Sequence, residues 1–79
     1  VWEEVSVRYR GDVARLGFDL INEPAPPRSW SEDRRRKEWW DFASVITRRI
    51  RQVDPLRTVV FEPINGASVR EFRRLESLP

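Results

Sequence analysis

The chain has 79 residues, with 15 Lys and Arg against 13 Asp and Glu, a formal net charge of +2, and no His or Cys. This length fits one domain at most, and a domain of this size buries only about 60% of its unfolded surface. Without Cys or His, neither a disulfide framework nor a Cys/His zinc site is possible. The chain is therefore either a well-idealised miniature or a part of something larger.

No apolar run approaches the roughly 18 residues that a membrane span requires. The first residues, Val1-Trp2-Glu3-Glu4, resemble neither a signal peptide nor an initiator methionine, so we expect further residues before them. The pI is near 9.9, but acidic residues are interspersed throughout. This charge balance argues only weakly for a nucleic-acid partner.

The first half of the chain predicts a helix end, a strand and a loop. Residues 1–10 fit helical or strand spacing, and Gly11-Asp12 favours the end of a helix. Residues 16–21, LGFDLI, are typical of a short buried strand, which Asn22-Glu23-Pro24 ends. Residues 24–29 then predict a stiff loop.

An amphipathic helix follows. Ser29 and Glu32 have the spacing of a capping box, and Pro55 indicates an end near Val53. The predicted buried stripe is Trp39, Phe42, Ala43, Ile46, Ile50 and Val53, and the predicted solvated face is Arg34, Arg35, Lys37, Glu38, Asp41, Arg48 and Arg49. The adjacent Trp39 and Trp40 are expected to serve packing.

The remaining residues predict a strand over 58–61, a turn over 64–67 and a short helix over 69–75. Two apolar strands joined by one helix form a right-handed parallel unit. Such a pair leaves both outer edges open. The fold class is therefore α/β, and we interpret residues 1–79 as a central slice of a larger α/β domain.

The strongest chemical signal is the sequence LINEP over residues 20–24, which places a carboxylate, Glu23, after a predicted parallel strand. That rim carries function in such folds, whereas the opposite rim serves stability. The plainer alternative is a solvated loop acid beside a helix-stopping proline. FDLINEP, a Trp-containing loop, ITRRIRQVDP and RTVVFEP together resemble the middle of glycoside hydrolase family 5.

This resemblance covers nearly the whole chain and implies one βαβ unit with flanking helices from a (β/α)8 TIM barrel, from the third helix to just before the sixth strand. It implies a retaining glycosidase acting on a β-linked oligo- or polysaccharide, without metal or organic cofactor. Glu23 would be the general acid/base, and Asn22 would hold the 2-hydroxyl of the substrate. Secretion is implied by the resemblance alone.

The chemistry agrees with these residue types. A glycosidic oxygen leaves readily only when an acid protonates it, and a second carboxylate about 5–5.5 Å away attacks the anomeric carbon. Because side chains alternate along a regular strand, Asn22 and Glu23 reach one pocket only if the backbone bends. We therefore predict irregular backbone at residues 22–24.

The attacking Glu of the family has no counterpart in this chain, so the chain alone is expected to be inactive and the rest of the barrel is an expected partner. Glu62 ends the second strand, and we interpret it as a pocket-shaping or capping residue rather than a substitute nucleophile. Trp30 is a candidate for stacking on a sugar ring, with plugging of the helix start as its alternative.

Alternative functions remain open. Within the family, the substrate could be a glycolipid or a mannan. From a different class, the chain could be a small Arg-rich module that binds nucleic acid or protein through residues 34–37. We interpret those residues as a solvated helix face paired with Glu32, Asp33, Glu38 and Asp41, and therefore expect no nucleic-acid partner. Arg51 and Asp54 are expected to be structural.

Overall fold

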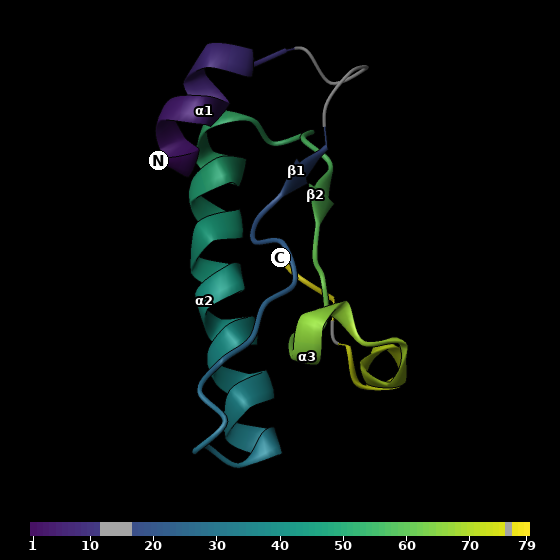
Figure 1. Cartoon of the computed structure of the whole chain (residues 1–79). Helices are drawn as coiled ribbons and strands as arrows, with labels where there is room; N and C mark the ends of the chain where they lie inside the picture. The colour runs from purple at the N-terminus through teal and green to yellow at the C-terminus, as the bar shows by residue number, and fades with distance from the viewer. Residues whose placement is uncertain (12–16, 76) are drawn as a thin grey trace.

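The computed structural model describes residues 1–11, 17–75 and 77–79 (Figure 1). Its elements, in chain order, are α1 (Trp2–Tyr9), β1 (Phe18–Asp19), α2 (Glu32–Val53), β2 (Val59–Val60), α3 (Ile64–Ala67) and the 3-10 helix η1 (Val69–Arg74). Figure 1 shows α2 as one long rod with α1 across its C-terminal end and the two strands beside its upper half. The predicted order of helix, strand, helix, strand and short helix is confirmed.

The two strands are parallel, as predicted. Phe18 pairs with Val59 and Asp19 pairs with Val60, and the Phe18 N–H donates to the Thr58 carbonyl at 2.8 Å. Each strand has two residues, so the predicted spans 16–21 and 58–61 were too long. The first strand ends early because its backbone bends over residues 20–23. Residue 16 lies outside the described residues.

α2 begins two residues later than the predicted capping box. The cap is Ser31, whose hydroxyl accepts from the Arg34 N–H at 3.2 Å, so the prediction of Ser29 with Glu32 was wrong. The helix starts later because the Trp30 N–H still donates to the Pro27 carbonyl of the preceding turn, at 3.1 Å. Ser31 then supplies the same type of side-chain acceptor that was predicted for Ser29. The predicted end near Val53 is confirmed.

The core lies between α2, the strands and the loop after β2. Its buried apolar residues are Phe18, Leu20, Trp39, Ala43, Ile50 and Ile64. Phe42 was predicted to join this stripe but is 54% exposed. The two strands cover only a narrow strip of α2, and Phe42 lies outside it. Thr47 is buried within that strip, where its hydroxyl donates to the Ala43 carbonyl at 2.7 Å.

α1 confirms the predicted helix over residues 1–10. It ends at Tyr9, and Gly11 follows with φ +85°, a conformation that glycine adopts freely. The Trp2 ring stacks on Phe18 at 5.1 Å between centroids. This contact places α1 over the end of the sheet.

The predicted turn over residues 64–67 is a left-handed helical turn, labelled α3. Asn65, Gly66 and Ala67 have φ values of 61°, 66° and 59°. The Ala67 N–H donates to the Pro63 carbonyl at 3.1 Å. The short helix predicted over 69–75 is confirmed as η1.

The basic run 34–37 is only partly the solvated face that was predicted. Arg36 pairs with Glu32 and Asp33, and Lys37 pairs with Asp41. Arg35, however, is only 8% exposed, because the proline loop folds back over the helix start and its Pro26 carbonyl accepts from Arg35 Nε at 3.3 Å. Within the described residues, no helix is both long and apolar enough to cross a membrane.

Candidate active site

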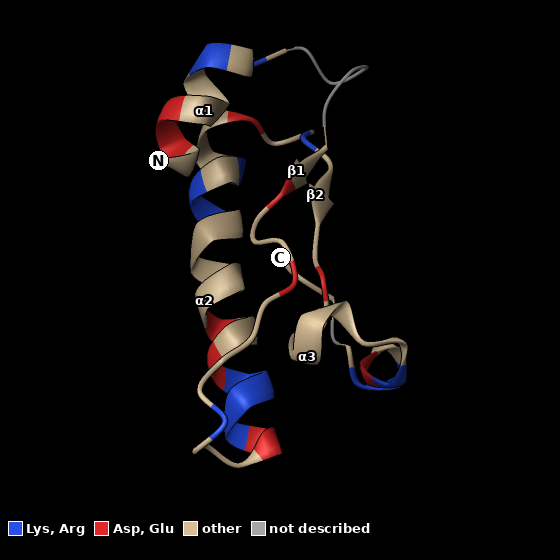
Figure 2. Ribbon diagram, viewed as in Figure 1, with Lys and Arg blue, Asp and Glu red and all other residues tan. Residues whose placement is uncertain are grey.

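Carboxylates gather where the two parallel strands end. Asp19 is the last residue of β1, Glu23 follows it, and Glu62 comes two residues after β2. Figure 2 shows acidic positions on both segments that leave the sheet. Because parallel strands end at the same edge, three carboxylates from distant parts of the sequence share one rim.

The backbone at Glu23 is irregular, which confirms the prediction for residues 22–24. Glu23 has φ +48°, a left-handed conformation that costs a residue with a Cβ about 1 kcal/mol or more. Two contacts with the chain after β2 hold this bend. The Glu23 N–H donates to Glu62 Oε1 at 3.4 Å, and the Pro24 carbonyl accepts from the Gly66 N–H at 3.3 Å.

Glu62 stands between the other two carboxylates. The neighbouring Asp19 carboxyl raises the pKa of Glu62, and burial and the negative charge of Glu23 act in the same direction, whereas the hydrogen bond from the Glu23 N–H opposes them. Two ionised carboxylates accept hydrogen bonds and cannot donate them. The raised pKa of Glu62 favours its protonated form, which is the form that can donate to a neighbouring carboxylate.

Glu23 and Trp30 line one cleft with a volume of about 710 Å³. Its other lining residues are Ala25, Arg28, Glu32, Arg35, Asn65 and Gly66. Asn22 is exposed and does not line this cleft. The structure therefore brings together two of the three site residues predicted from the sequence and leaves Asn22 outside.

Trp30 is half-buried, and one side of its ring is occupied. The guanidinium carbon of Arg34 lies 3.9 Å from the ring centroid, within the range of a cation–π contact. The indole thus has a cationic support from α2 while it lines the cleft. This arrangement fixes the ring without filling the cleft.

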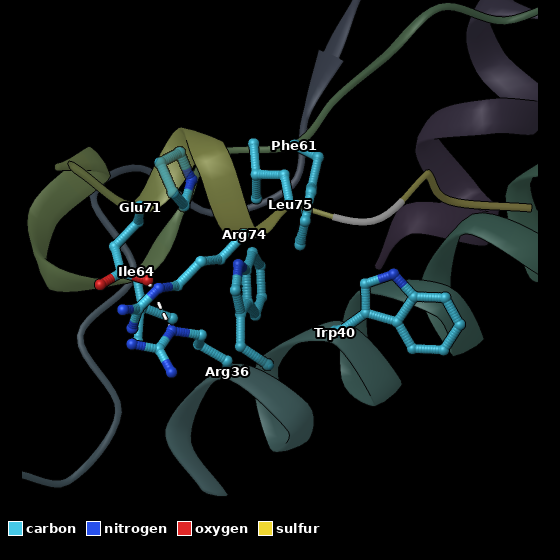
Figure 3. Close-up of a pocket in the computed structure, with 9 residues that line it drawn as sticks. Arg36, Trp40, Phe61, Ile64, Glu71, Arg74 and Leu75 are labelled. Carbon is cyan, nitrogen blue, oxygen red and sulfur yellow. Dashed lines mark hydrogen bonds and ion pairs between the residues drawn. The ribbon is translucent and has the colours of Figure 1, made fainter. Parts of the chain in front are cut away.

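A second, much smaller cavity of about 30 Å³ lies between α2 and η1 (Figure 3). Aromatic and aliphatic side chains surround it, including Trp39, Trp40 and Phe61, and Arg36 and Glu71 are ion-paired beside it at 2.7 Å. Its volume suits about one or two water molecules. It shares no lining residue with the cleft.

The sequence analysis missed Asn65 and Arg28 as cleft residues. A signal for Asn65 was present, because the Asn65-Gly66 turn follows the second strand and must therefore lie at the rim where Glu23 lies. Glu62 does not line the cleft, and its Oε1 accepts from a backbone N–H. These contacts agree with a pocket-shaping role and not with that of an attacking group.

The model of the family described as cellulase (glycosyl hydrolase family 5) matches residues 1–76 of the chain. No curated protein and no solved structure matches the chain.

Proposed function

Since the chain belongs to the cellulase family, glycosyl hydrolase family 5, we propose that it is part of a retaining O-glycoside hydrolase. Membership in this family points to glycoside hydrolysis. The proposed substrate is a β-linked glucan or a related polysaccharide. Residues 1–79 would form the central slice of a (β/α)8 barrel, and its other strands would supply the attacking carboxylate.

One observation carries this proposal: the Glu23 carboxylate follows a parallel strand, on a left-handed residue, and lines an open cleft together with Trp30. Catalytic groups of barrel enzymes come from this end of the strands. An acid that serves a polymer must lie where a long substrate has access. The cleft offers that access, and Trp30 offers an aromatic wall.

In the proposed reaction, Glu23 protonates the glycosidic oxygen as its bond to the anomeric carbon breaks. A carboxylate from another strand attacks that carbon from the opposite side and forms a covalent glycosyl intermediate. Glu23, now ionised, takes a proton from a water molecule as the water oxygen attacks the anomeric carbon. The bond from that carbon to the attacking carboxylate breaks, and the sugar leaves with retained configuration. Neither a metal nor an organic cofactor takes part.

Asn22 keeps its proposed role as a donor to the substrate 2-hydroxyl and to the attacking carboxylate. An amide donates without adding charge, so it can bridge a sugar and a carboxylate. Its exposed position outside the cleft means that the missing strands would have to form the surface that it contacts. Among the alternatives, no contact in the described residues favours a glycolipid, a mannan or a nucleic acid.

The test is Glu23→Gln in the complete protein that carries this segment. Hydrolysis of a natural glucan should fall by about 10²–10⁴-fold, because an acid catalyst typically contributes that much. An aryl glycoside with a good leaving group needs little protonation, so formation of its glycosyl intermediate should slow far less.

The matched control is Glu38→Gln, which makes the same chemical change at an exposed position of α2 outside the cleft. It should leave both rates within a few-fold. Small and equal effects of Glu23→Gln on the two substrates would remove Glu23 from the proposed mechanism.

A further inference from the structure

Glu23 lies in a backbone conformation that its own residue type does not favour. A non-glycine residue with φ +48° persists only when its surroundings hold it, because the strain is about 1–3 kcal/mol. Pro24 does not supply that constraint alone, since proline directs the preceding residue towards extended backbone with negative φ. The contacts that hold Glu23 must therefore come from elsewhere in the chain.

Glu62 supplies a side-chain contact to this backbone. Its Oε1 accepts the Glu23 N–H at 3.4 Å across 39 positions of sequence. The main chain of Glu62 is itself fixed, because its carbonyl accepts from Trp39 Nε1 at 2.8 Å. A buried core tryptophan therefore anchors the residue that contacts the bend.

The second carboxylate oxygen of Glu62 completes the arrangement. Glu62 Oε2 is buried and has no donor among the described residues. The charged groups that act on Glu62 there are Asp19 and Glu23, both acidic. A proton held between Glu62 and Asp19 would satisfy the buried oxygen and remove one of the three charges at the rim.

We propose that Glu62 is a positioning residue for Glu23: its Oε1 accepts the Glu23 N–H and holds the bend that presents the Glu23 carboxyl to the cleft. This proposal rests on the proposed function of Glu23 as the acid. Glu62 itself touches no substrate. Its effect on the reaction passes through the placement of Glu23.

The protonated form of Glu62 has a close chemical mimic. Glutamine keeps an oxygen that accepts from the Glu23 N–H and gains an N–H that donates to Asp19. Glu62→Gln should therefore preserve the bend, whereas Glu62→Ala and Glu62→Met remove the acceptor. Met has a similar length, so it separates the lost hydrogen bond from a simple loss of volume.

The experiment compares these three variants in the complete protein on a natural glucan and on an aryl glycoside with a good leaving group. Glu62→Gln should keep kcat within about threefold on both substrates. Glu62→Ala and Glu62→Met should lower kcat on the glucan by about 10²-fold, the scale of a catalytic group displaced by about 1 Å, with little change in KM. Their effect on the aryl glycoside should be much smaller.

Equal losses on both substrates in the Ala and Met variants would indicate a general structural role and overturn the proposal. A Glu62→Gln variant as impaired as Glu62→Ala would overturn it as well. Far-ultraviolet circular dichroism checks folding, and if Ala unfolds, the comparison of Gln with Met decides. If Glu23→Gln shows the leaving-group effect while the Glu62 variants do not, only the positioning role fails. If Glu23→Gln does not show it, the proposed function fails first.

Discussion

Asp54 and Arg57 form a buried ion pair at the point where α2 turns into β2. Arg57 Nη2 lies 2.8 Å from Asp54 Oδ2, and the side chains are 0% and 5% exposed. The same guanidinium donates to the Tyr9 carbonyl of α1 and lies 4.6 Å from the centre of the Phe18 ring. One arginine therefore joins the first helix, the first strand and the end of the long helix.

Asp54→Ala should destabilise the fold strongly. Asp54→Ala removes the carboxylate of a buried ion pair while the Arg57 guanidinium stays buried, a change that typically costs about 3–5 kcal/mol. The free energy of unfolding, measured by urea denaturation, should fall by that amount. Asp41→Ala is the control, because Asp41 forms an exposed pair with Lys37 and its loss should cost less than about 1 kcal/mol. Equal losses in the two variants would contradict a structural role for the buried pair.

Local sequence patterns were enough to predict the parallel unit and its order. The apolar segment around Phe18, the helical spacing from Trp39 to Ile50 and the apolar segment around Val59 each depend on near neighbours. Pro24 and Pro55 predicted the adjacent boundaries for the same reason. The bend at Glu23 could be predicted because two polar residues followed a strand that alternates its faces.

The side-chain contacts could not be predicted in this way. Arg57 and Arg35 are buried because acceptors from other segments, such as the Tyr9 and Pro26 carbonyls, reach them. The spacing of residues along the sequence does not predict these contacts between distant segments. The link from Glu62 to Glu23 was missed for the same reason, and Phe42 was misplaced because the width of the covering sheet was unknown.

The left-handed turn α3 gives a prediction with opposite signs at adjacent residues. At Gly66, with φ +66°, an added Cβ meets no atom within 4 Å, so Gly66→Ala should cost about 1–2 kcal/mol from backbone strain alone. Ala67 already bears such strain at φ +59°, so Ala67→Gly should stabilise the fold by up to about 1 kcal/mol. Urea denaturation measures both changes.

Gly17→Ala is the control for this pair. The added Cβ would meet Thr58 Cγ2 at 3.5 Å, an ordinary contact, and Gly17 does not have a left-handed φ. Stability should therefore change by less than about 1 kcal/mol. A loss at position 17 as large as that at position 66 would show that the left-handed backbone is not the cause.

Glu71 gives a pH-dependent prediction. Arg36, whose Nε donates to Glu71 at 2.7 Å, holds the pKa of that carboxyl below its ordinary value of 4.5. The folded state therefore releases the Glu71 proton more readily than the unfolded state does. The charged group stabilises the fold above the unfolded pKa, and this contribution is lost as the pH falls through the folded pKa.

Glu71→Gln should consequently lower the free energy of unfolding by about 1–2 kcal/mol at pH 7, since hydrogen bonds to charged groups contribute about that much. The difference from the wild type should shrink as the pH falls below about 4.5. Urea midpoints at several pH values measure it. Glu62→Gln should give a stability difference of the opposite sign at pH 7. The pKa of Glu62 is raised, so its protonated form is the stabilising one, and glutamine mimics that form at every pH. A constant difference across this range would contradict the role of the Glu71 charge.

Trp30 gives the last prediction, which concerns substrate affinity. One side of the indole is held by Arg34, and the ring lines the same cleft as Glu23, so the ring is positioned to stack on a sugar. In the complete protein, Trp30→Ala should raise KM for a glucan by about 3–10-fold, since an aromatic contact contributes about 0.5–1.5 kcal/mol. Trp30→Phe should recover most of that affinity, and kcat should change little in either variant. Arg34→Gln, which removes the cationic support and keeps the ring, should give a smaller rise in KM. If Trp30→Ala lowered kcat and left KM unchanged, Trp30 would act in the placement of Glu23 and not in binding.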